Sequence, residues 1–145
     1  MKEYADKTRN AAASVFGTID VTVAHASAFL EQTNTINSKS DLQSSYYSFS
    51  VKLIRVIEQI DCITNDISKL IIAFDRSNDL AGVVYANSLF DLLVSLRKVL
   101  QEFLEHGEKI LKAEEPPFLF SSIKKETDIL MRKIILAKDG FKKYL

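Results

Sequence analysis

The sequence predicts an all-α protein: a single domain over residues 1–145, folded as an antiparallel up-down-up-down four-helix bundle with long helices. Apolar residues recur every three or four positions over four long stretches, as on the buried faces of helices. Only four glycines and two prolines are present, too little turn material for a β fold. The segments that separate the four stretches are short, which predicts antiparallel neighbours.

The strongest pattern lies in residues 42–74. Its ten positions alternate steps of four and three without an intervening glycine or proline: Leu42, Tyr46, Phe49, Leu53, Val56, Ile60, Ile63, Ile67, Leu70 and Phe74. An average spacing of 3.5 residues keeps one helix face toward its partners, as in a coiled coil. We expect the other helices to cover this face.

A thinner apolar face is predicted for the first helix, residues 3–32. Its positions are Ala5, Ala12, Ile19 and Ala26, interleaved with Phe16, Val23 and Leu30. Gly17 is interpreted as a packing glycine, although glycine costs about 1 kcal/mol of helix propensity relative to alanine. The polar segment 33–40 follows, with Ser38 or Ser40 as the N-cap of the next helix.

The third helix is expected over residues 80–112 and the fourth over residues 118–142. The first of these carries Ala86, Leu89, Leu93, Leu96, Leu100, Phe103 and Ile110, and the second carries Phe120, Ile123, Thr127, Leu130, Ile134, Ala137 and Phe141, continued by Tyr144. Turn residues at 75–79 and prolines at 116 and 117 separate the helices. Two alternatives stay open: the turn near Ser77 straightens in an oligomer, or helices exchange between two chains.

Composition narrows the class of protein. Nineteen basic residues balance nineteen acidic ones, which disfavours a nucleic-acid-binding domain. The single cysteine, Cys62, excludes an internal disulfide and is interpreted as a packed residue. We see no signal peptide and no apolar run long enough to cross a bilayer, so we expect a cytoplasmic protein without a membrane partner.

No catalytic, cofactor or metal site is predicted, and we expect a protein that is not an enzyme. A di-metal bundle needs Glu-x-x-His pairs, which neither His25 nor His106 completes. Glu102 and His106 are four residues apart and share a helix face, but His106 is interpreted as a solvated residue. Glu102, Glu105 and Glu108 form a row typical of a solvated face, and no glycine-rich phosphate loop is present. A site assembled from distant helices stays open, so a hydrolase is kept as the weakest hypothesis.

Charge is unevenly distributed along the chain. Residues 41–115 hold twelve acidic and eight basic residues, whereas residues 116–145 hold three acidic and seven basic ones, so these parts carry −4 and +4. Nucleic-acid binding through Lys124, Lys125, Arg132 and Lys133 is therefore the alternative hypothesis. The simpler interpretation is that the basic helix offsets the acidic helices packed beside it.

Surplus apolar residues give the leading hypothesis. They lie outside the predicted buried faces of the second and fourth helices, at Tyr47, Val51 and Ile54 and at Ile129, Ile135 and Leu136. A helix that is apolar on every side is expected to be buried on every side. We therefore predict a non-enzymatic interaction or accessory protein that forms a homo-oligomer or binds a protein partner through these six residues.

Overall fold

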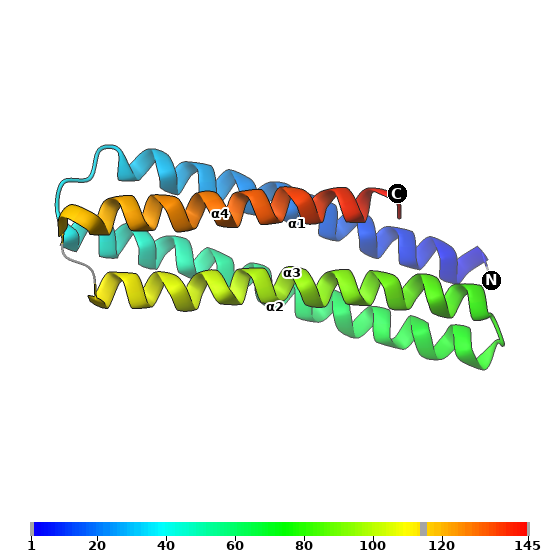
Figure 1. Ribbon diagram of the computed structural model, residues 1–145. Coiled ribbons are helices and arrows are strands. Elements are labelled where there is room, and N and C mark those ends of the chain that lie inside the picture. Colours follow the sequence, from blue (N-terminus) through cyan, green and yellow to red (C-terminus); the bar gives the residue numbers. More distant parts are fainter. Residues whose placement is uncertain (1, 114–115, 145) are drawn as a thin grey trace.

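Four helices form an antiparallel bundle in the computed structural model, which describes residues 2–113 and 116–144 and the side chains of residues 6–112 and 118–144. They are α1 (Lys2–Thr33), α2 (Lys39–Arg76), α3 (Leu80–Ala113) and α4 (Pro116–Lys142). Successive helices run in opposite directions, and α4 returns beside α1 (Figure 1). Each helix therefore has two neighbours, whereas α2 and α4 lie on a diagonal. The predicted fold class is confirmed.

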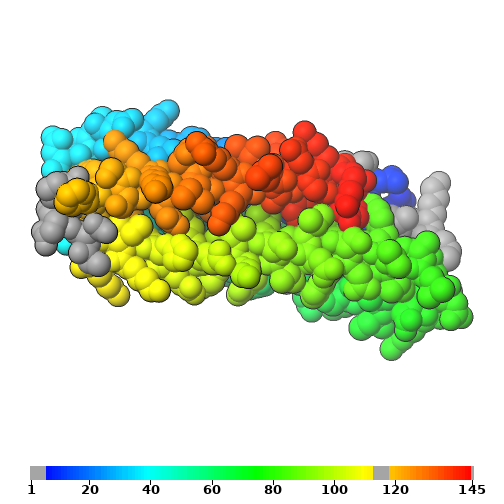
Figure 2. Space-filling view, in the orientation of Figure 1, coloured from blue at the N-terminus to red at the C-terminus, as the bar shows by residue number. Residues whose placement is uncertain are grey.

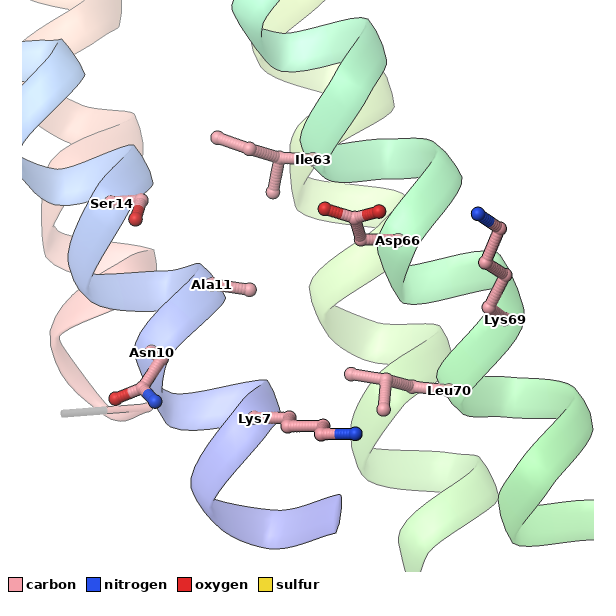
Figure 3. Close-up of a pocket in the computed structure, with 8 residues that line it drawn as sticks. All are labelled: Lys7, Asn10, Ala11, Ser14, Ile63, Asp66, Lys69 and Leu70. Carbon is pink, nitrogen blue, oxygen red and sulfur yellow. The ribbon is translucent and has the colours of Figure 1, made fainter. Parts of the chain in front are cut away.

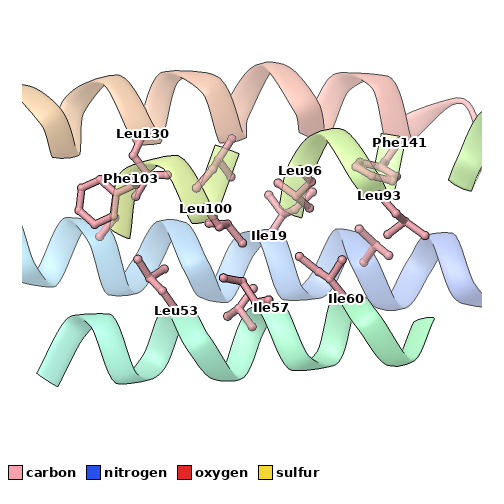
Figure 4. Close-up of a cluster of buried hydrophobic side chains, with 14 of the residues drawn as sticks. Ile19, Leu53, Ile57, Ile60, Leu93, Leu96, Leu100, Phe103, Leu130 and Phe141 are labelled. Atoms are coloured by element: carbon pink, nitrogen blue, oxygen red, sulfur yellow. The ribbon is translucent and has the colours of Figure 1, made fainter. Parts of the chain in front are cut away.

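The core is built around α2, as predicted. Nine of the ten positions predicted on α2 are buried, and the tenth, Ile63, is partly buried. Ile57 joins them, so the buried face is wider than the spacing of 3.5 residues indicated. Leucines of α3 and Ile19 of α1 pack against this face (Figure 4). Burial of these aliphatic side chains is the main stabilising term of the fold.

Aromatic rings from three helices meet near the connection between α1 and α2. The rings of Phe29 and Phe49 stack with their centroids 4.9 Å apart, and Phe103 meets Phe49 edge-on at 5.6 Å. Tyr46 lies beside Phe29 and Phe103, with centroid distances of 6.1 and 6.0 Å. This cluster joins α1, α2 and α3 at one end of the bundle.

The predicted buried face of α1 is only half right. Ala12, Ile19 and Ala26 are buried, but the residues between them in the core are Thr8, Val15, Thr22 and Phe29. Phe16, Val23 and Leu30 are only partly buried, and the Ala5 side chain lies outside the described residues. The buried Thr22 hydroxyl donates to the carbonyl of Thr18 at 2.8 Å, which removes most of the cost of burying it.

The other two buried faces follow the prediction with small shifts. On α3, Ile110 is partly buried, and Gly107 and Leu111 are buried. On α4, Leu119 takes the buried place predicted for Phe120, and Ala137 is partly buried. The remaining predicted positions of both helices are buried. The Glu114–Glu115 pair lies outside the described residues.

Local hydrogen bonds fix the two described connections. Ser38 caps α2 by accepting from the backbone N–H of Asp41 at 3.1 Å, as predicted. Asn78 adopts a left-handed conformation with φ of 56° in the turn before α3. Asp79 then caps α3 by accepting from the N–H of Gly82 at 3.0 Å. The turn near Ser77 is therefore closed in this structure.

Two helices contradict the expectation that no segment is apolar enough to cross a bilayer. By length and composition, Asp6–Thr33 and Leu80–Lys112 both qualify, and only 28% and 22% of their most apolar windows are buried in the bundle. The sequence estimate missed them because it looked for uninterrupted apolar runs, whereas these windows include small and polar uncharged residues. Core helices of soluble bundles have the same length and composition, so cytoplasmic localisation stays a prediction.

Candidate interaction surfaces

The two exposed faces predicted from the sequence lie on opposite sides of the bundle. We name Tyr47, Val51 and Ile54 the α2 stripe, and Ile129, Ile135 and Leu136 the α4 stripe. Because α2 and α4 lie on a diagonal, the two stripes do not form one surface. Figure 2 shows α4 and α3 across one face, with α2 largely hidden behind them. A single partner surface therefore does not cover both stripes at once.

The α2 stripe is partly open to solvent. Tyr47 is 71% exposed and Ile54 is 47% exposed, whereas Val51 is only partly exposed. Ile54 also lines a cavity of about 280 Å³ between α2 and α3, which we name the α2–α3 groove. Its other lining residues are Tyr46, Ser50, Ile57, Gln101, Leu104, Glu105 and Glu108. The groove thus has an apolar floor and two carboxylates on its α3 side.

The α4 stripe also has two exposed residues and one that is partly buried. Ile135 and Leu136 are exposed, to 47% and 71%, and Ile129 is partly buried. Ile129 lines a cavity of about 250 Å³ between α3 and α4, the α3–α4 groove. Val99, Glu102, Phe103, His106, Glu126, Leu130 and Lys133 complete its lining. Lys133 therefore lies in this groove together with the carboxylates of Glu102 and Glu126, so its charge is mixed.

His106 lies in the α3–α4 groove and is better anchored than the sequence indicated. Its Nδ1 is 3.0 Å from Oε1 of Glu126 on α4, while its side chain keeps 53% exposure. Glu102 lines the same groove and pairs with Lys98 at 4.0 Å. Among the described residues, no three histidine, cysteine or acidic side chains cluster as metal ligands. This polar pair links two helices across an open groove.

His25 is the second histidine and lies on the α2 side of α1. Partial burial, and then the nearby positive charge of Lys52 on α2, lowers the pKa of His25 below its ordinary value. Both causes disfavour the imidazolium form.

Two residues predicted to pack in the bundle are exposed instead. Cys62 is exposed, because it lies off the buried face of α2. Gly17 is exposed too, and a Cβ atom added there would meet nothing within 4 Å. The packing interpretation of both residues is wrong, since a small side chain within an apolar stretch does not by itself show which way the residue faces.

A third groove runs between α1 and α2. Two cavities of about 420 and 730 Å³ lie side by side there and share the lining residues Ser14 and Ile63; we name them together the α1–α2 hollow. Figure 3 shows Ala11 of α1 facing Ile63 and Leu70 of α2 across it. Cys62 lines the larger cavity. The hollow exists because the side chains of α1 on this side are small.

The basic residues of α4 are partly neutralised within the bundle. Arg132 pairs with Asp128 at 3.0 Å, and Lys138 pairs with Asp20 of α1. Of the four residues predicted for nucleic-acid contact, Lys124 is only partly exposed, whereas Lys125 and Lys133 are exposed. No ion pair joins these three lysines to another described residue, so the structure leaves part of the positive charge uncompensated.

Comparison with known proteins adds no relative: no family model, no curated protein and no solved structure matches the chain.

Proposed function

We propose that this chain is a non-enzymatic interaction protein that self-associates or binds a protein partner through the α2 and α4 stripes. The observation that carries the proposal is the exposure of large apolar side chains on a bundle whose core is formed by other apolar residues. Tyr47 and Leu136 are each 71% exposed, although the described core leaves no buried side-chain nitrogen or oxygen atom unpaired. Exposed apolar patches of this kind mark interaction sites.

The candidate chemistry of the bundle supports a binding role. His25 and His106 lie on different helices, α1 and α3, and the groove that holds the His106–Glu126 pair has no serine, threonine or cysteine among its lining residues. The grooves lie between neighbouring helices and have apolar lining residues, as in helix-in-groove recognition.

The test is the molar mass of the purified protein, measured by light scattering over a range of concentrations. We expect the mass of the wild type to rise with concentration, and the double variant Ile54→Glu/Leu136→Glu to stay monomeric. Ile72→Glu is the matched control, because Ile72 is also an exposed isoleucine of α2, at 51%, outside both stripes. A wild type that stays monomeric at high micromolar concentration, and that captures no protein in a stripe-dependent way, contradicts the proposal.

Nucleic-acid binding through α4 is the second candidate, favoured by the uncompensated charge of Lys124, Lys125 and Lys133. Each phosphate that these residues neutralise contributes about −0.9 to the slope of log affinity against log salt for duplex DNA. Reversal of Lys124, Lys125, Arg132 and Lys133 to glutamate should abolish binding to duplex DNA, measured by fluorescence anisotropy. Binding that persists in this variant excludes α4 as the contact.

A further inference from the structure

We infer that copies of this chain associate head to tail. One face of α4, which carries Lys125, Ile129, Lys133 and Leu136 and which we name the α4 face, docks in the α2–α3 groove of the next copy. The inference rests on the proposed self-association and specifies its geometry and its partner, a second copy of the chain. Three features of the structure carry it: the opposite placement of the two stripes, the equal spacing of their apolar residues, and the opposite charge beside them.

The placement of the stripes decides the symmetry. A twofold dimer pairs the same patch on both copies, so it covers one stripe twice and leaves the other exposed. Since α2 and α4 lie on a diagonal, covering both stripes requires different patches of successive copies to meet. Such contacts are heterologous, and they produce rings when the rotation closes and filaments when it does not.

The spacing of the apolar residues matches between the two faces. Tyr47 and Ile54 are seven residues apart on α2, and Ile129 and Leu136 are seven residues apart on α4. Two helical turns separate each pair, about 10.5 Å along the axis. Because the two spacings are equal, both apolar residues of α4 can meet both apolar residues of α2 when α4 of one copy packs along α2 of the next.

Charge on the acceptor face is negative. Glu105 and Glu108 line the α2–α3 groove, are exposed, and have no ion pair with another described residue. No lysine or arginine is among the residues that line this groove, and the exposed Lys109 and Lys112 of α3 lie outside its lining. A partner that enters the groove therefore meets two carboxylates and no basic lining residue.

Charge on the α4 face is positive and has matching positions. Lys125, Ile129, Lys133 and Leu136 follow one another at steps of four, four and three residues, so they share one helix face. Lys125 and Lys133 are exposed and have no ion pair within the described chain. The lysines alternate with the two apolar residues, and this pattern suits a groove with an apolar floor and an acidic rim.

The test uses two single variants that each block one face. Ile54→Glu disables the acceptor groove and Leu136→Glu disables the α4 face, so each variant alone should lose assembly, with apparent affinity weakened about tenfold or more. An equimolar mixture should form 1:1 dimers, because one intact groove and one intact α4 face remain between the two variants. Sedimentation velocity distinguishes these species, and circular dichroism checks that each variant stays helical.

A charge exchange provides an independent measurement. Glu105→Lys/Glu108→Lys should not assemble alone but should bind Lys125→Glu/Lys133→Glu, and the wild-type contact should weaken with added salt. Ile72→Glu should assemble like the wild type.

The remaining outcomes overturn the head-to-tail inference, and they show whether the proposed function fails with it. Loss of assembly in only one of the single variants indicates a twofold dimer, which leaves the proposed self-association intact. A mixture that stays monomeric also overturns the head-to-tail geometry. A monomeric wild type whose stripes capture another protein keeps the proposed function but not this inference, and a monomer without stripe-dependent binding contradicts both.

Discussion

The hydroxyl of Tyr46 donates a hydrogen bond of 3.1 Å to the backbone carbonyl of Leu104, and so connects α2 to α3. This bond is possible because Gly107, one turn further along α3, has no side chain. A Cβ atom at position 107 would overlap the hydroxyl and the ring of Tyr46. The glycine that interrupts the apolar pattern of α3 is therefore required by a tyrosine on the neighbouring helix.

Gly107→Ala should destabilise the protein by about 1–3 kcal/mol, because the added methyl group forces the buried ring to move. Chemical denaturation monitored by circular dichroism measures this loss. In the double variant with Tyr46→Phe the two losses should be less than additive, since the overlap with the hydroxyl is gone. A neutral Gly107→Ala contradicts the described packing.

Gly17→Ala should have the opposite effect. Gly17 is exposed within α1, and its added Cβ meets no neighbouring atom, so only helix propensity changes. We expect a gain of about 0.5–1 kcal/mol in the free energy of unfolding. The same denaturation assay tests it, and a loss of stability shows that this side of α1 is covered.

Stability should fall at high pH through Tyr46. Burial, and then the negative charges of Glu108 and Glu126, raises the pKa of its hydroxyl above the ordinary value. The unfolded chain therefore loses the proton first, so this contribution is complete below about pH 10 and decreases as pH rises further, by up to about 1.4 kcal/mol per pH unit.

Tyr46→Phe should reduce this alkaline slope, measured from urea unfolding at pH 9 to 11, and should cost about 1 kcal/mol at neutral pH for the lost hydrogen bond. Some slope remains because burial, and then Tyr144, also raises the pKa of Tyr85. An unchanged slope in Tyr46→Phe contradicts the assignment.

Asn78 should tolerate glycine but not alanine. Its φ of 56° lies in the left-handed region, where alanine costs about 1–2 kcal/mol and glycine very little. Asn78→Ala should lower the thermal unfolding midpoint, whereas Asn78→Gly should leave it close to that of the wild type. Equal effects of the two substitutions would show that the turn adopts another conformation in solution.

The sequence predicted the fold well where large side chains repeat. Bulky residues on α2 repeat so regularly that only one face can be buried. On α1 the same reasoning chose Phe16 over Thr22, because polarity alone does not show that a threonine hydroxyl bonds its own helix backbone. The environment of Gly17 depends on the rotation of α1, which its small residues do not specify, whereas Cys62 is exposed because it lies off the predicted buried face of α2.

The candidate surfaces were predictable only as separate helix faces. Exposure of Tyr47 and Leu136 follows from the positions of these residues outside the buried faces. The diagonal placement of α2 and α4 follows from the predicted up-down-up-down order. The position of Glu105 and Glu108 beside Ile54 depends on how α2 and α3 are rotated against each other. That information arises from packing between distant segments, so a pattern within one helix does not contain it.

The aromatic cluster and the cavity beside Ala11 lie at different positions along the bundle. We therefore expect local opening to cost more free energy at the aromatic cluster than beside Ala11. Amide protons around Phe29 and Phe49 are expected to exchange with solvent only when the whole domain unfolds. Amide protons around Ala11 and Ser14, where small side chains line a cavity, are expected to exchange through local opening of α1. The aromatic cluster is therefore expected to be the last part of the bundle to open.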